Sequence, residues 1–110
     1  HIRARGLFLV TIFRWDDLML EKQIETKLKR EVKRIGGMAF KLATPGNAGV
    51  PDRLVLLPTG DVVFVELKAP GKKLRPLQLK RKKQLENLGF KVYVIDSYKK
   101  IDAFIEDVMF

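Results

Sequence analysis

The chain has 110 residues, 46% of them hydrophobic and 32% charged, a balance typical of one compact domain rather than a disordered or membrane-spanning chain. The absence of cysteine excludes disulfides, thiolate catalysis and cysteine-bound zinc, so any metal would need oxygen ligands or His1. A formal net charge of +9 predicts a polyanionic partner, with nucleic acid ahead of an anionic membrane.

Residues 1–18 differ from the rest, because a basic start precedes the short apolar run Leu7 to Phe13. This run could be a strand, and it loosely resembles a signal peptide, although no small-residue cleavage site follows. Since Met19 could begin a complete domain, we interpret residues 1–18 as an upstream extension or cloning remnant without assigned function. Residues 19–110 then form the functional domain.

The first predicted element is an amphipathic helix that Asp16 or Asp17 could cap. Its apolar positions recur every three or four residues: Leu20, Ile24, Leu28, Val32 and Ile35. Gly36 and Gly37 end it. Met38 to Leu42 is a candidate strand, and Thr44 to Gly49 is too rich in Gly, Pro and Asn to be regular.

A β-hairpin is predicted next, with strands Arg53 to Leu57 and Asp61 to Lys68. Pro58-Thr59-Gly60 suits a three-residue loop, because proline presets the first turn position and glycine adopts positive φ. Val62 to Val65 is apolar on both faces, which indicates a central strand.

The second half contains a helix, a strand and a last helix. Pro76 suits a helix start, with apolar positions at Leu77, Leu85 and Leu88 and a stop at Gly89. Lys91 to Asp96 alternates as a strand, and Ser97 can cap a helix that carries Ile101, Phe104, Ile105 and Val108. The order αβββαβα predicts an α/β fold with a central mixed β-sheet flanked by helices.

Three charged residues converge in this arrangement. Glu66 and Lys68 project from the same face of their strand. If the hairpin loop has three residues, Leu57 pairs with Asp61, and counting outward brings Asp52 opposite Glu66. Their β-carbons would then be about 5 Å apart, or roughly 7 to 8 Å in a diagonal register, which suits two carboxylates that share one cation.

The chemistry expected of this trio is metal-assisted hydrolysis. Mg²⁺ suits a site with few carboxylates, several waters and phosphate oxygens, and it would lower the pKa of a water molecule. Lys68 could orient the attacking water or stabilise charge on the phosphate. The structural alternative is that Pro51-Asp52 makes a turn and that Glu66 and Lys68 form a solvated ion pair.

At this point the residues resemble a known family. The motifs are Gly49-Val50-Pro51-Asp52, Phe64-Val65-Glu66-Leu67-Lys68 and, in the following helix, Gln78. They are similar to the PD-(D/E)XK nuclease superfamily, most closely to its VRR-NUC (virus-type replication-repair nuclease) branch, over about residues 19 to 98.

The resemblance implies a restriction-endonuclease-like core that hydrolyses phosphodiester bonds with Mg²⁺ or Mn²⁺. Asp52, Glu66 and the carbonyl of Leu67 would bind the metal, and Lys68 would act in catalysis. Stand-alone members resemble Holliday junction resolvases, which implies a homodimeric DNA endonuclease that acts on branched DNA in the cytoplasm of a bacterial or phage-infected cell. The alternatives are an inactive nucleic-acid-binding module and a nuclease for linear DNA or RNA.

The resemblance also implies a glutamate on the first helix near the metal, and we expect Glu25 rather than Glu21. The alternative is an ordinary ion pair between Glu25 and Lys29. Gln78 could contact a metal-bound water or Lys68, or it could be a surface glutamine.

Seven basic residues could follow the phosphates beside the cleft, giving salt-sensitive binding with little sequence preference. They are Lys72, Lys73, Arg75, Lys80, Arg81, Lys82 and Lys83. A solvated helix face would also explain the last four. The Thr44 to Gly49 loop could hold its backbone close to DNA; the alternative is that its glycines serve only the turn.

Overall fold

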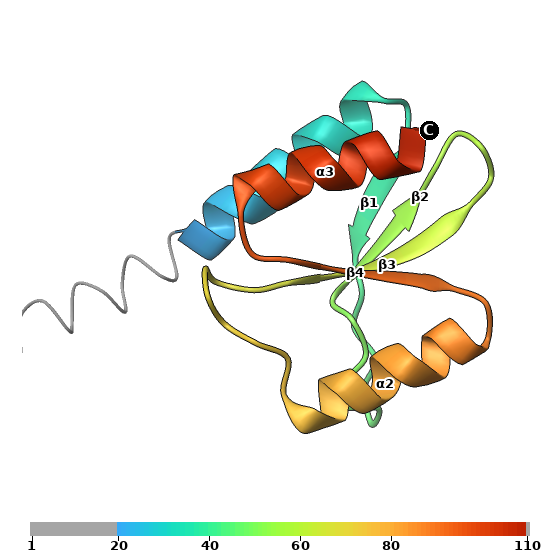
Figure 1. The fold of residues 1–110 in the computed structure, drawn as a ribbon. Coiled ribbons are helices and arrows are strands. Elements are labelled where there is room, and N and C mark those ends of the chain that lie inside the picture. Colours follow the sequence, from blue (N-terminus) through green and yellow to red (C-terminus); the bar gives the residue numbers. More distant parts are fainter. Residues whose placement is uncertain (1–19, 110) are drawn as a thin grey trace, which may run out of the picture.

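The computed structural model describes residues 20–109 of the chain (Figure 1). The first helix spans residues 20–34 in this part. The later elements are β1 (Met38–Lys41), β2 (Arg53–Leu56), β3 (Val62–Leu67), α2 (Pro76–Asn87), β4 (Lys91–Ile95) and α3 (Tyr98–Met109). The predicted order is confirmed, whereas the predictions for residues 1–18, including the cap at Asp16 or Asp17, lie outside the described residues.

The strands form one mixed sheet in the order β1-β2-β3-β4. β1, β2 and β3 pair antiparallel, and β3 pairs parallel with β4, so β3 is central as predicted. The first helix and α3 lie together on one face, and α2 lies on the other (Figure 1). No helix within residues 20–109 is both long and apolar enough to cross a membrane.

The hydrophobic core lies between the sheet and the two helices that share a face. Because side chains alternate along each strand, every second residue faces these helices. The sheet contributes Val55, Leu57, Val63, Val65, Leu67 and Ile95, and the helices contribute Ile24, Leu28, Val32, Ile101, Phe104 and Ile105. Most apolar positions predicted for the first and last helices therefore lie in the core or pack against it, as Ile35 and Val108 do, whereas Leu20 is 39% exposed. Ser97 also accepts a hydrogen bond from the backbone N–H of Lys100 at 3.1 Å, which confirms the predicted cap.

The opposite face of the sheet is covered less completely. Among the α2 residues only Gln78 is buried, whereas Leu77 and Leu88 are 43% and 73% exposed. The predicted helix is present, but two of the apolar positions that indicated it, Leu77 and Leu88, are not buried. α2 approaches closely at Gly49, where an added Cβ would lie 2.7 Å from the carbonyl oxygen of Leu77.

The hairpin has the predicted three-residue loop. The backbone N–H of Leu57 donates to the carbonyl of Asp61 at 2.9 Å, and Gly60 has a φ of 88°. Arg53 pairs with Val65 and Leu56 with Val62. Continuing this register by one residue places Asp52 opposite Glu66, because their strands run antiparallel.

Candidate active site

Asp52 is joined to Glu66 by one hydrogen bond and to the next residue, Leu67, by a second, each between a side chain and the backbone. The N–H of Asp52 donates to Oε2 of Glu66 at 2.9 Å, and the N–H of Leu67 donates to Oδ1 of Asp52 at 3.1 Å. Each carboxylate is thus held by the backbone of the neighbouring strand. The predicted meeting of the two acids across the hairpin is confirmed.

The Glu66 carboxyl is an unfavourable place for a negative charge. Its residue is only 7% exposed. Burial raises the pKa of Glu66 to about 7, and the nearby negative charge of Asp52 acts in the same direction. The N–H of Asp52 and the ammonium of Lys68 oppose this rise. A cation between the two acids would favour their ionised forms.

Lys68 lies on the same side of the strand as Glu66, as predicted from the alternation. Its Nζ is 3.8 Å from Oε1 of Glu66, and its side chain is 15% exposed. The backbone N–H of Lys68 donates to the carbonyl of Ile95 at 2.9 Å, which ties the end of β3 to the end of β4. The ammonium is therefore half-buried beside the acids, unlike the solvated ion pair that we considered as an alternative.

Gln78 completes the set of contacts around Glu66. Its Nε2 donates to Oε1 of Glu66 at 2.8 Å, while its own Oε1 accepts from the N–H of Arg75 at 2.9 Å. Gln78 is buried, so the alternative of a surface glutamine is wrong. Its partner in the structure is Glu66, a contact that we did not predict.

Arg53 is a neighbour of the site that the sequence analysis missed. It is 3% exposed, and its NH2 lies 2.6 Å from Oε2 of Glu25. Its NH1 donates to the carbonyl of Asp52 at 2.9 Å and lies 3.4 Å from Oδ2 of the same residue. Arg53 precedes the inward residues Val55 and Leu57 at a spacing of two. This alternation could have predicted from the sequence that the side chain of Arg53 faces the core. A buried arginine needs acidic partners, so it would also have predicted acidic side chains nearby.

Glu25 reaches the site through Arg53. It also pairs with Lys29 at 3.3 Å, so the ordinary helix ion pair exists as well. Burial by itself would raise the pKa of Glu25, but Arg53 and then Lys29 outweigh that effect and hold it below its usual value. Within residues 20–109, Glu21 has no ion pair with any of these groups. Of the two glutamates, Glu25 is the one beside the site.

The donors at hand suit a hard cation. No group of three or more His, Cys, Asp or Glu side chains within the described part of the chain is placed to hold a metal ion. Two carboxylates and a backbone carbonyl remain, which is a small oxygen set of the kind that Mg²⁺ accepts when it keeps several waters. A cation at this place would offset the burial and the negative charge of Asp52, which raise the pKa of Glu66.

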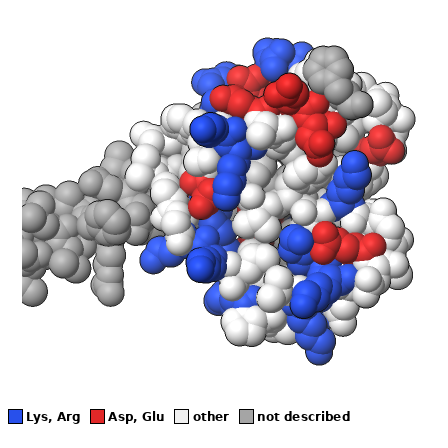
Figure 2. Space-filling model, in the orientation of Figure 1, with Lys and Arg blue, Asp and Glu red and all other residues white. Residues whose placement is uncertain are grey.

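The basic residues between Lys72 and Lys83 differ in their surroundings. Arg81 donates to the carbonyl of Ala48 at 3.1 Å, and Lys82 pairs with Glu86 at 3.1 Å. Lys72, Lys73, Arg75, Lys80 and Lys83 are exposed. Figure 2 shows basic side chains over the part of the molecule where α2 lies, and most acidic ones in the upper part, where α3 lies. The charge is thus unevenly distributed over this face.

Comparisons with known proteins agree on one family. The family model described as the VRR-NUC domain matches residues 5–99. "Putative nuclease p44" of Acyrthosiphon pisum secondary endosymbiont phage 1 is 52% identical over 80 residues, which cover 73% of this chain and 86% of the relative. A solved structure described as a VRR_NUC domain matches with a TM-score of 0.74 and 35% identity, over 79% of this chain and 95% of its own.

Proposed function

Because the chain belongs to the VRR-NUC family, we propose that it is a metal-dependent DNA endonuclease that hydrolyses phosphodiester bonds. The observation that carries the proposal is that backbone N–H groups hold the carboxylates of Asp52 and Glu66 opposite each other, with the ammonium of Lys68 3.8 Å from Glu66. A buried acid with a pKa raised to about 7 is costly to keep unless it serves a ligand or a reaction.

Each residue has a role in this proposal. Asp52, Glu66 and the backbone carbonyl of Leu67 would hold the metal. When bound, Mg²⁺ or Mn²⁺ supplies a Lewis acid that polarises the phosphate and lowers the pKa of water. Lys68 places its ammonium next to Glu66, where it stabilises negative charge that develops on the phosphate.

Gln78 and Glu25 support these groups without touching the reacting atoms. Gln78 fixes one oxygen of Glu66 by its hydrogen bond, which orients that carboxylate. Glu25 neutralises Arg53, which in turn contacts both the carbonyl and the carboxylate of Asp52.

We further propose that the enzyme is a homodimer that prefers branched DNA, in the cytoplasm of a bacterial or phage-infected cell. Two sites related by a twofold axis would cut two strands of one junction. The relative "Putative nuclease p44" is a phage protein, which supports this setting. Most of the affinity would come from the seven basic residues, by contacts with phosphates: Lys72, Lys73, Arg75, Lys80, Arg81, Lys82 and Lys83.

A cleavage assay tests the activity. Purified protein with Mg²⁺ or Mn²⁺ is incubated with linear, flapped and four-way DNA and with matched RNA, and its oligomeric state is measured by light scattering. We expect cleavage of DNA, fastest for the branched substrates. Lys68→Ala should abolish cleavage while binding stays measurable, and Lys99→Ala, at an exposed lysine of α3, is the control. If neither metal supports cleavage of any substrate, the proposal of an enzyme is wrong, and the protein is instead an inactive nucleic-acid-binding module.

A further inference from the structure

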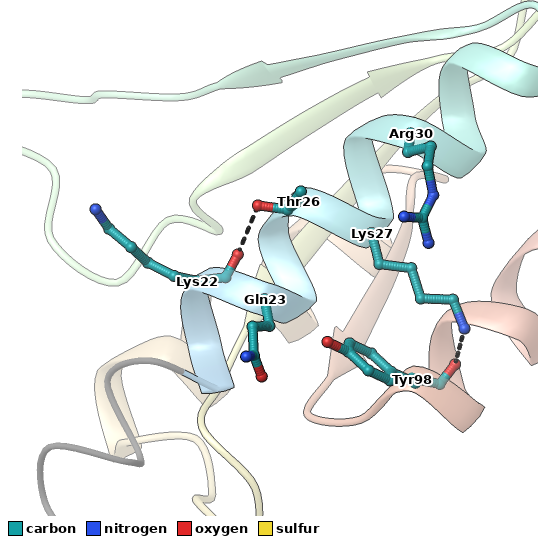
Figure 3. A pocket seen from close by; sticks show the side chains of 6 residues that line it. All are labelled: Lys22, Gln23, Thr26, Lys27, Arg30 and Tyr98. Carbon is teal, nitrogen blue, oxygen red and sulfur yellow. Dashed lines mark hydrogen bonds between the residues drawn. The ribbon is translucent and has the colours of Figure 1, made fainter.

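A groove lies between the first helix and the start of α3, outside the candidate active site. Its volume is about 440 Å³, within the range of small-ligand sites. Six residues line it: Lys22, Gln23, Thr26, Lys27, Arg30 and Tyr98 (Figure 3). It contains none of the groups that we assign to hydrolysis.

The groove is positively charged. Lys27 is held in place by Asp102 at 2.9 Å and by the carbonyl of Tyr98 at 3.5 Å. Within residues 20–109, Lys22 and Arg30 have no acidic partner, so their charges are free to meet an anion. Both residues line the groove, two helical turns apart; the side chain of Arg30 lies near Lys27, whereas that of Lys22 extends away from Tyr98 at the other end (Figure 3).

The groove also presents an aromatic ring. Tyr98 is 46% exposed at the first position of α3. The Nζ of Lys27 lies 4.9 Å from the centroid of the ring, which holds the ring by a cation–π contact. An exposed ring among cations is the combination by which proteins hold single-stranded nucleic acid, since the ring stacks on a base while the cations contact phosphates.

Its position in the fold links the groove to the candidate site. Tyr98 follows the end of β4, which the hydrogen bond from Lys68 to Ile95 joins to the end of β3. On the first helix, Thr26 lines the groove, and the preceding residue, Glu25, reaches Arg53 beside Asp52. A nucleic-acid strand that leaves the candidate active site at this end of the β-sheet would therefore pass beside the groove.

We propose that this groove binds an unpaired nucleotide of the substrate, with Tyr98 stacked on its base and Lys22 and Arg30 on its phosphates. The inference rests on the proposed function in one respect, that the substrate is a nucleic acid. It adds a substrate class, namely nucleic acid with a single-stranded segment beside the cleavage site.

A binding assay in EDTA, which prevents metal-dependent cleavage, tests the proposal. The full chain is titrated in EDTA with a fluorescent single-stranded oligonucleotide, as DNA and as RNA, and anisotropy is recorded. Tyr98→Ala should weaken binding about tenfold, while Tyr98→Phe, which keeps the ring, should bind as the unmodified chain does. On an oligonucleotide of abasic sites the two variants should bind alike.

A separate experiment tests whether the positive charges of Lys22 and Arg30 contribute to binding. Lys22→Ala with Arg30→Ala should lower the slope of log affinity against log salt by about 1.4, the loss expected for two phosphate contacts on a single strand. The matched control is Lys33→Ala with Lys99→Ala, which removes two exposed lysines outside the groove. Thermal melts verify that every variant is folded.

The proposal is overturned if Tyr98→Ala binds like Tyr98→Phe, or if the groove pair and the control pair lose the same affinity. These outcomes are separate from failure of the proposed function. A chain that cleaves no substrate with metal can still bind oligonucleotide through the groove, and a chain that cleaves DNA can still bind equally well without Tyr98.

Discussion

Glu25 and Arg53 join the first helix to the start of β2 by an ion pair of 2.6 Å, with the arginine side chain only 4% exposed. The same guanidinium contacts Asp52, so it connects the helix to a candidate metal ligand. Its Nε is buried and has no hydrogen-bond partner among residues 20–109. Arg53 therefore depends on its two acidic neighbours to remain buried as a cation.

Removing the charge of Glu25 is expected to destabilise the fold. Glu25→Gln should lower the free energy of unfolding by about 1 to 3 kcal/mol, because a buried cation loses one of its partners. Glu21→Gln is the matched control on the same helix, and it should stay within about 0.5 kcal/mol. Urea denaturation measures both, and equal effects would show that the ion pair contributes no net stability.

The raised pKa of Glu66 makes the stability of the metal-free protein depend on pH. Between the ordinary pKa of 4.5 and about 7, the folded carboxyl holds a proton that the unfolded one has released. The folded state therefore binds more protons, and stability should fall as pH rises through this window. Groups such as Glu25, whose pKa is lowered, lose their contribution only at more acidic pH.

The comparison of Glu66→Gln with the unmodified chain isolates this effect from other titrating groups. The amide side chain keeps the shape of the carboxyl and cannot ionise. The free energy of unfolding of the Glu66→Gln variant should therefore depend less on pH between 4.5 and 7. Thermal melts in EDTA across this range give the difference. If the difference in Tm between the unmodified chain and Glu66→Gln does not change with pH, the pKa of Glu66 is not raised.

A divalent metal should stabilise the folded chain through the same two acids. At a metal concentration a hundredfold above Kd, a ligand that binds only the folded state adds about 2.7 kcal/mol. Mg²⁺ or Mn²⁺ should thus raise the Tm of the unmodified chain, and EDTA should reverse it. Asp52→Asn and Glu66→Gln should lose the response, whereas Asp61→Asn, at an exposed acid that follows the hairpin loop, should keep it. Equal responses in all three variants would place the metal elsewhere.

Gly49 should tolerate substitution less well than Gly46. Both have positive φ, of 85° and 79°, so alanine strains the backbone at either position. At Gly49 the new Cβ would also lie 2.7 Å from the carbonyl oxygen of Leu77, whereas nothing lies within 4 Å at Gly46. We expect Gly46→Ala to cost about 1 kcal/mol and Gly49→Ala clearly more. Chemical denaturation measures the difference, and equal costs would mean that α2 can shift freely at this contact.

The sequence by itself determined the order of the elements and the meeting of Asp52 with Glu66. Both follow from local rules, because side chains alternate along strands and a three-residue loop with glycine at its end fixes the hairpin register. The placement of Lys68 beside Glu66 follows from the same alternation.

Only the tertiary structure decided which partners these residues have. Gln78 contacts Glu66, Glu25 reaches the site by pairing with Arg53, and Arg53 lies between Glu25 and Asp52. The tertiary structure alone also decided that Leu77 and Leu88 are exposed and that a groove lies beside Tyr98. These contacts join elements that are distant in the chain, so they depend on how helices pack against the sheet, and the periodicity of a single segment carries no information about that packing.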